Sequence, residues 1–91
     1  MLPREELIAT MREQLNATCT PTSLTIIDDS AQHIGHRGHG GAGHFTVQIV
    51  SDAFSGLSLL KRHQLVYQAL SAYIGNDIHA LSIAAKTPDE M

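Results

Sequence analysis

The sequence predicts one small α+β domain that spans residues 1–91. Its length falls within the usual size of a single domain and leaves no room for a second core. Hydrophobic residues make up 43% of the chain and charged residues only 16%, as in ordinary globular folds and unlike disordered tails. Helical and strand-like periodicities follow one another in the order helix, strand, strand, helix, strand, and a final helix begins at the end. This order favours a three-stranded mixed sheet.

The first element is an amphipathic helix predicted over residues 3–17. Pro3 near its start and two glutamates in its first turn favour a helix N-terminus. Its apolar residues recur at spacings of three to four, at Leu7, Ile8, Met11 and Leu15. Threonines and a proline in residues 18–23 end the helix, and the β-branched residues 24–28 predict the first strand.

A glycine-rich segment separates the first strand from the second. Residues 29–43 hold five glycines and few apolar side chains, so we expect a long flexible loop. Residues 44–50 alternate as a half-buried strand does, with Phe45, Val47 and Ile49 on one face. The two strands are expected to pair as an antiparallel hairpin.

A second helix and a third strand complete the sheet. Residues 58–74 have a helical period, and Gly75 follows as a stop signal. The apolar positions of this period are Leu59, Leu60, Val66, Tyr67, Leu70 and Ile74. Residues 78–84 predict a strand, which the helical crossover can lay parallel to its neighbour. Thr87, Pro88 and Glu90, at the N-cap, N1 and N3 positions, predict the start of a last helix.

Charge and cysteine content narrow the function classes. The formal net charge of -3, with only six Lys and Arg residues, argues against a large phosphate-binding surface. Cys19 is the only cysteine, so no internal disulfide can form, and an inert thiol in a reducing compartment is expected. The start is charged and lacks a long apolar run. We therefore expect a cytoplasmic protein that does not associate with membranes.

The sequence does not predict an enzyme. The one candidate acidic run is Asp28, Asp29 and Ser30, beside the glycine-rich loop. Adjacent residues in an extended segment point to opposite faces, so the two carboxylates are poorly placed to share a proton. A turn at the strand end accounts for all three residues. We expect a binding protein.

Six histidines form the chemically distinctive part of the sequence. His33, His36 and His39 are spaced by three residues in the glycine-rich loop, where they could chelate zinc, nickel or copper, but a solvated loop is favoured over a dedicated three-histidine site. His63 falls in the apolar stripe of the second helix and is interpreted as a partly buried histidine. His79 shares a face with Leu81 and Ile83 by strict alternation, whereas His44 lies on the polar face of its strand and is given no ligand role.

Five segments together resemble the BolA family. They are DDSAQH at 28–33, GHFTVQIVS at 43–51, FSG at 54–56, KRHQLVY at 61–67 and IHALSI at 78–83. The resemblance extends over nearly the whole chain, and the order and spacing of the last two segments are specific to the family. The resemblance implies a fold related to class II KH domains, and it agrees with the element order predicted from periodicity.

The resemblance also implies a partner and a cofactor. Members of the family form heterodimers with monothiol glutaredoxins and share a 2Fe-2S cluster, for which glutaredoxin supplies a cysteine and glutathione supplies its thiolate. Carried over by position, the metal ligands of this chain are His79 and the loop residue His33. His36 and His39, which crowd the same loop, are less favoured. Imidazole in place of thiolate removes charge and raises the reduction potential of a cluster.

Two other functions are carried as alternatives. One is a KH-like DNA-binding regulator of stress or envelope genes, with Lys61, Arg62 and His63 as the phosphate-contacting residues. The Gly-x-x-Gly clamp of KH domains is missing, because residues 54–57 read Phe-Ser-Gly-Leu. The other is an interaction domain that binds zinc through its loop. The sequence leaves open the proteins that receive a cluster, and it leaves open weak homodimer formation.

Overall fold

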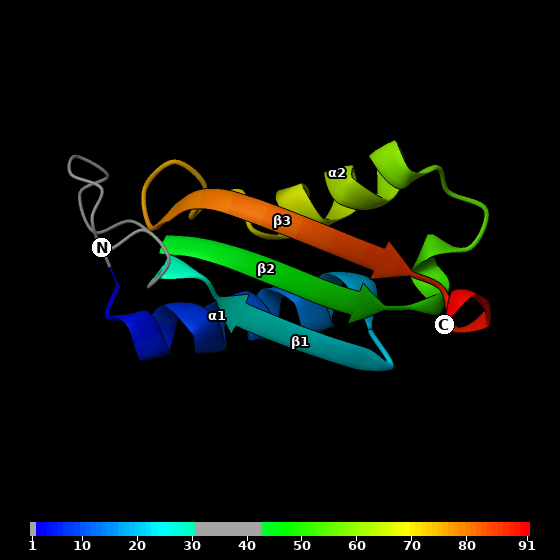
Figure 1. Cartoon of the computed structure of the whole chain (residues 1–91), viewed down its shortest axis with the longest axis horizontal. Helices are drawn as coiled ribbons and strands as arrows, with labels where there is room; N and C mark the ends of the chain where they lie inside the picture. The colour runs from blue at the N-terminus through cyan, green and yellow to red at the C-terminus, as the bar shows by residue number, and fades with distance from the viewer. Residues whose placement is uncertain (1, 31–42) are drawn as a thin grey trace.

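The computed structural model describes residues 2–30 and 43–91. Both long helices lie behind a three-stranded sheet in the view of Figure 1, with α1 crossing behind the strands and α2 running along β3. The elements, in order, are α1 (Arg4–Cys19), β1 (Ser23–Asp28), β2 (Gly43–Val50), η2 (Asp52–Phe54), α2 (Leu59–Ala69), β3 (Ile78–Lys86) and η3 (Pro88–Glu90). This is the predicted α+β architecture. Most of the loop predicted at 29–43 lies outside the described residues.

The sheet has the predicted topology, with β2 in its centre. β1 pairs antiparallel with β2, and β2 pairs parallel with β3. Phe45, Val47 and Ile49 are at most 2% exposed, because this face of β2 packs against the helices. The opposite face of the sheet carries mostly polar and small side chains, such as Thr25, Gln48 and Ala84, together with Ile27, which is 39% exposed.

Helix α1 buries one residue in every turn. Its buried stripe consists of Leu7, Met11, Leu15 and Cys19, at the spacing of four that keeps side chains on one helix face. The helix extends two residues beyond the predicted end at residue 17, so Cys19 is its last residue rather than part of the following turn. Thr20 then ends the helix in a left-handed conformation, with φ of 40°.

Helix α2 is shorter than the helix predicted over residues 58–74. It ends at Ala69 instead of residue 74. Turns occupy residues 70–77, except that Ile74 forms an isolated bridge with Ile78. The chain must reverse here to bring β3 alongside β2, and Tyr73 O accepts hydrogen bonds from three successive backbone amides as it does so. Gly75 takes a positive φ of 89° in this reversal. Leu70 remains fully buried, so the period continues past the helix end.

The buried stripe of α2 also differs from the predicted one. Leu59 and Leu60 are 66% and 67% exposed, although their spacing predicted burial. Arg62 and Val66 are the buried residues of the helix. The spacing of apolar residues does not reveal this stripe, because one of its two members is a charged residue.

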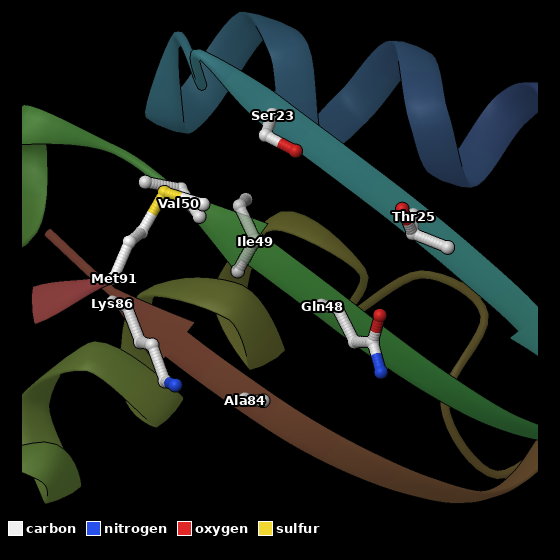
Figure 2. A pocket seen from close by; sticks show the side chains of 8 residues that line it. All are labelled: Ser23, Thr25, Gln48, Ile49, Val50, Ala84, Lys86 and Met91. Atoms are coloured by element: carbon white, nitrogen blue, oxygen red, sulfur yellow. The ribbon is translucent and has the colours of Figure 1, made fainter. Parts of the chain in front are cut away.

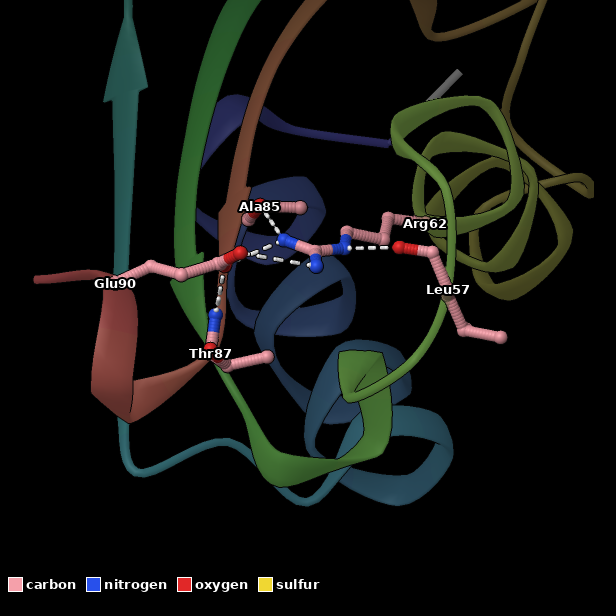
Figure 3. Close-up of polar contacts among 5 residues, drawn as sticks. All are labelled: Leu57, Arg62, Ala85, Thr87 and Glu90. Atoms are coloured by element: carbon pink, nitrogen blue, oxygen red, sulfur yellow. Dashed lines mark hydrogen bonds and ion pairs between the residues drawn. The ribbon is translucent and has the colours of Figure 1, made fainter.

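Arg62 can be buried because each nitrogen of its guanidinium donates to an acceptor (Figure 3). Nε donates to Leu57 O at 3.0 Å and Nη1 donates to Ala85 O at 3.2 Å. The two terminal nitrogens also reach both carboxylate oxygens of Glu90, at 2.6 and 3.1 Å. Such bidentate pairs are the stronger class of charged hydrogen bond. Arg62 thereby joins α2, the end of β3 and the C-terminal turn.

The C-terminal turn carries the predicted capping residues but forms a 3-10 turn. The side chain of Thr87 and that of Glu90 make a capping box around Pro88–Glu90. Glu90 Oε1 accepts the backbone N–H of Thr87 at 2.8 Å as well as the guanidinium of Arg62. In the described part of the chain, no helix is long and apolar enough to cross a membrane.

The contact between Arg62 and Glu90 predicts a pH-dependent stability. Hydrogen bonds from Arg62, and then from the Thr87 backbone, lower the pKa of Glu90 from 4.5 to about 2. Stability from this carboxylate is therefore fully present above pH 4.5 and is lost as the pH falls toward about 2. We expect Glu90→Gln to lower the melting temperature at neutral pH, and we expect its difference from wild type to vanish toward the lower value.

Thermal unfolding measured across this pH range checks the prediction. Asp89→Asn is the matched control, because it removes the same charge from an exposed neighbour in the same turn. Its melting temperature should remain close to that of wild type. An undiminished deficit of Glu90→Gln at the acidic end would contradict the role assigned to the carboxylate.

Candidate functional site

A β-bulge at the start of β3 sets the position of His79. Gly43 pairs with Ile78 and His44 pairs with Ala80, so β3 contains one extra residue, His79, opposite this step of β2. Ile78 is fully buried, whereas His79 is exposed. Strict alternation predicted that His79 shares a face with Leu81 and Ile83. That prediction was wrong, because the extra residue changes the alternation at this point.

The bulge brings His79 beside His44. The centroids of the two imidazole rings are 5.0 Å apart, and the ring planes are inclined by 46°. His44 follows buried Gly43 and precedes buried Phe45, and its own side chain is half-buried on the opposite face of β2. Sequence reasoning gave His44 no ligand role. Only the pairing register of β2 and β3 reveals this neighbourhood.

The two ends of segment 31–42 are anchored at the same end of the sheet. On one side, Ser30 Oγ accepts the backbone N–H of His44 at 3.0 Å and a hydrogen bond from Arg4 Nη1 at 3.0 Å. On the other side, Gly43 N donates to Asp77 O at 2.9 Å, two residues before His79. The segment therefore leaves and rejoins the fold next to the pair of His44 and His79.

Arg4 connects this end of the sheet to the start of α1. Its guanidinium lies 5.3 Å from the ring centroid of Phe45 and its Nε lies 3.8 Å from Asp28 Oδ2. Partial burial acts to raise the pKa of Asp28, but hydrogen bonds from Ser30 and the charge of Arg4 outweigh it, so the pKa lies below its usual value. Asp28 is therefore ionised at neutral pH.

Of the predicted metal ligands, only His79 lies in the described part of the chain. His33, His36 and His39 fall in residues 31–42, outside it. Chain length still limits their reach: His33 is three residues from Ser30, which spans at most about 10 Å. Among the described residues, no group of three or more His, Cys, Asp or Glu side chains could hold a metal ion. A metal site with three or more protein ligands must therefore include donors from residues 31–42 or from a partner protein.

Cys19 lies at the other end of the sheet from His79. Its carbonyl accepts the hydroxyl of Ser51, which directly follows β2, whereas His79 stands beside the first residues of β2. Seven residue steps along a strand separate these ends by roughly 20 Å. The Cys19 side chain is fully buried, and burial raises its pKa. The predicted inert thiol agrees with this environment.

The candidate phosphate contacts do not form one exposed group. Lys61 is exposed and His63 is half-buried, but Arg62 is only 8% exposed and is bound to Glu90 and two backbone carbonyls. Its guanidinium is therefore committed to the fold. Phe54, in the region where a KH clamp would lie, is fully buried in the core.

A shallow hollow of about 410 Å³ lies on the outer face of the sheet, away from the histidine pair. Figure 2 shows it between Thr25 of β1, Gln48 of β2 and Lys86 of β3, with Met91 at one side. Its lining residues come from the opposite end of β2 and β3 from His44 and His79. The hollow is thus separate from the candidate metal-binding residues.

Comparison with known proteins identifies relatives along the chain. Residues 15–90 match the protein family described as BolA-like protein. Protein BOLA1, chloroplastic, of Arabidopsis thaliana is 46% identical over 90 residues, which is 94% of this chain and 56% of that protein. SufE-like protein 1, chloroplastic/mitochondrial, of the same plant is 46% identical over 87 residues, which is 89% of this chain and 24% of that protein. The chain thus spans about half and about a quarter of these two relatives.

Solved structures resemble the fold over nearly its full length. BolA1 from Arabidopsis thaliana has a TM-score of 0.80 at 42% identity, with 93% of this chain and 95% of that chain covered. The BolA domain of SufE1 from the same plant has a TM-score of 0.81 at 44% identity, with both chains covered completely. BolA1 from Mus musculus has a TM-score of 0.78 at 38% identity, with 92% of this chain and 67% of that chain covered.

Gly43 is predicted to be essential for packing at this end of the sheet. A Cβ atom at this position would overlap Arg4 Nη1 and the ring of Phe45. The arginine can move aside, but the Phe45 ring is fixed in the core. We expect Gly43→Ala to lower the free energy of unfolding by about 1–3 kcal/mol, the usual range for overpacking. Urea unfolding measures this change.

The same substitution in an Arg4→Ala background serves as the control. Gly43→Ala is compared with wild type, and the double variant is compared with Arg4→Ala. The second comparison measures the loss of stability that comes from the overlap with Phe45 alone. Most of the loss should persist in this background. Equal stability of Gly43→Ala and wild type would show that the backbone shifts freely here, contrary to the packing described.

Proposed function

The chain belongs to the BolA-like protein family, and on this basis we propose that it is an adaptor that binds a monothiol glutaredoxin and co-ligates a 2Fe-2S cluster. In this proposal it acts in iron-sulfur cluster trafficking or in iron and redox regulation. It binds its partner and cofactor and turns over no substrate of its own. The observation that carries the proposal is the exposed position of His79, beside both anchors of the histidine-rich segment.

His79 is suited to a metal that a second protein also holds. Its side chain is exposed, and the preceding residue, Ile78, is fully buried in the core. A fixed backbone with an accessible imidazole allows a partner to approach closely without unfolding this end of the sheet. Neutral imidazole is a common ligand of iron and zinc in proteins.

The donor set of this chain fits a cluster whose thiolates come from outside. Its one cysteine, Cys19, is fully buried and lies at the other end of the sheet. A 2Fe-2S cluster can accept two histidines in place of two cysteines, as Rieske centres do. Glutaredoxin and glutathione would supply the remaining thiolates, which this chain cannot offer.

His33 is proposed as the second ligand from this chain. It is the histidine of the segment nearest to the anchor at Ser30, within at most about 10 Å of chain. Binding through His33 therefore orders fewer residues than binding through His36. Each fixed residue costs about 1–2 kcal/mol of backbone entropy. On this reasoning His33, three residues from Ser30, is preferred over His36 and, by one residue, over His39, which lies four residues before the second anchor at Gly43.

Imidazole ligation would adapt the cluster for release or sensing. When bound, such a cluster supplies one-electron chemistry and can pass to a recipient protein, and neutral ligands raise its reduction potential. The chain's own part is to present His79 from a fixed strand and to bring the loop ligand from a tethered segment.

One relative supports a binding role. The BolA domain of SufE1 matches this chain over its whole length, so the same fold occurs as one part of a larger SufE-like protein. There the domain is joined to further sequence in one polypeptide, as expected of a module that works together with other domains. A DNA-binding role gains no comparable support, because Arg62 is committed to Glu90.

Co-expression with a monothiol glutaredoxin of the same organism tests the proposal. We expect a coloured heterodimer whose visible absorption and circular dichroism differ from those of the glutaredoxin homodimer, because imidazoles replace some of the thiolate ligands of the cluster. His79→Ala should abolish the mixed-ligand spectrum, and His33→Ala should shorten the cluster lifetime. His36→Ala combined with His39→Ala should leave both nearly unchanged.

His63→Ala is the matched control, because His63 is a half-buried histidine on α2, away from the sheet end that carries His79. Its spectrum should be that of wild type. If the two proteins remain separate and colourless after anaerobic reconstitution, the proposal is contradicted. A stable cluster in the variant that lacks both His33 and His79 would disprove the ligand assignment, and dependence on His36 and His39 alone would favour a zinc-binding loop instead.

A further inference from the structure

We infer that the outer edge of β1 is a pairing surface for a second copy of this chain, with the two β1 strands antiparallel about a two-fold axis at Ile26. The occupant is a second copy because the backbone groups and the charges of this edge are complementary to themselves. The inference does not rest on the proposed function, since it uses none of the candidate metal ligands.

The edge of the sheet formed by β3 is shielded by a helix. β1 and β3 are the outer strands of the sheet, and α2 runs along β3 (Figure 1). Tyr67 of this helix donates its hydroxyl to the Leu81 carbonyl at 3.4 Å, and Arg62 donates to the Ala85 carbonyl at 3.2 Å. Side chains of α2 therefore occupy the places that another strand would take beside β3.

The outward backbone groups of β1 belong to alternate residues. Asp29 N donates to the carbonyl of its partner in β2 at 2.7 Å, so the odd-numbered residues of this strand face β2. The backbone N–H and C=O groups of Leu24, Ile26 and Asp28 therefore point away from the sheet. In the described part of the chain, one side chain donates to this row, from Arg12 to Leu24 O at 3.1 Å. Such a row is a template for pairing with another strand.

An antiparallel pairing centred on Ile26 serves these groups in both copies. Each Ile26 exchanges two backbone hydrogen bonds with Ile26 of the second copy, and Leu24 lies opposite Asp28 of the second copy, because both are two residues from the axis. The same register sets Thr25 opposite the exposed Ile27 of the second copy on the outer face. Cross-strand pairs of β-branched residues stabilise a sheet. Two three-stranded sheets thereby become one continuous sheet.

The charges at the two ends of this edge are opposite in sign and lie on the same side of the sheet. Arg12 belongs to α1 and reaches β1 at Leu24, whereas Asp28, at the other end, lies beside Arg4 of the same helix. In the paired register, each Arg12 comes beside Asp28 of the second copy, and the contact occurs twice by symmetry. Opposite charges placed in this way fix the register of an interface.

Both groups can make this contact while they keep their present ones. The Leu24 carbonyl has two lone pairs, so it can accept Arg12 together with an amide of the second copy. Asp28 Oδ1 accepts the backbone N–H of Ser30 at 2.9 Å, and its Oδ2 lies 3.8 Å from Arg4 Nε. An ionised carboxylate offers about four acceptor positions, so a further donor can be accommodated.

The dimer is expected to be weak. Each β1 strand has only six residues, so their pairing buries less than the roughly 1,200 Å² of a typical stable interface. Exposed ion pairs add little to the affinity. We expect a dissociation constant of about 0.1–1 mM.

Sedimentation equilibrium of the full chain tests the inference, with a chelator present so that metal ions cannot link two copies. We expect a dimer whose fraction grows with concentration up to about 1 mM. Arg12→Glu and Asp28→Lys should each weaken self-association by about tenfold or more, because each replaces two attractive contacts with two repulsive ones. An equimolar mixture of these two variants should associate as wild type does, because both contacts of the mixed dimer again join opposite charges.

Lys61→Glu is the matched control, because it changes the net charge as Arg12→Glu does, at an exposed position of α2. It should associate as wild type does, and far-UV circular dichroism checks the fold of each variant. If Asp28→Lys does not fold, amide hydrogen exchange of wild type tests the interface without any substitution. The amides of Ile26 and Asp28 should become protected as the concentration rises, whereas those of Thr25 and Ile27, which face β2, should be protected throughout.

Three results would overturn the inference. The first is a chain that stays monomeric up to the highest concentration, including one whose Ile26 amide becomes protected only when a different protein is added. The second is a mixture of folded Arg12→Glu and Asp28→Lys that associates no more strongly than either variant alone. The third is a dimer in which the Ile26 amide exchanges as freely as in the monomer.

Discussion

The parallel pairing of β3 alongside β2 is the constraint on which both ends of this molecule depend. At one end the pairing includes a bulge, and the extra residue is His79, whose ring lies 5.0 Å from that of His44. At the other end it brings the Ala85 carbonyl and the C-terminal turn to the guanidinium of Arg62. Arg62 therefore stabilises the strand whose opposite end positions the candidate ligand. The pairing of β2 with β3 thus determines both the packing of the C-terminal turn and the position of His79.

Much of the fold could be predicted because its elements follow simple periodicity. The spacing of Leu7, Met11 and Leu15 predicts α1, and the alternation of Phe45, Val47 and Ile49 predicts β2. The errors come from tertiary contacts that periodicity does not contain. Burial of Arg62 depends on acceptors from segments that are distant in sequence. The spacing of apolar residues therefore did not reveal it and placed Leu59 and Leu60 in the buried stripe. The end of α2 is likewise set by the reversal that β3 requires.

The candidate site was also predicted only in part from the sequence. His79 could be singled out as a ligand from its resemblance to a family motif, but its orientation could not be predicted, because a bulge leaves no mark on the alternation of residues around it. His44 was missed for the same reason: its neighbour across the strands is known only from the register. The sequence shows only that His44 directly precedes a buried aromatic residue, Phe45, at the start of a strand. His33 was reached by resemblance alone, and its role stays a prediction.

The central feature of this site is the placement of the His79 ring on the outer face of the sheet beside His44. Nuclear Overhauser contacts of the imidazole protons in the free, metal-free chain measure this placement. The account predicts cross-peaks between the rings of His44 and His79. Cross-peaks from the His79 ring to the side chains of Leu81 and Ile83, with none to His44, would instead place His79 on the inner face and contradict it.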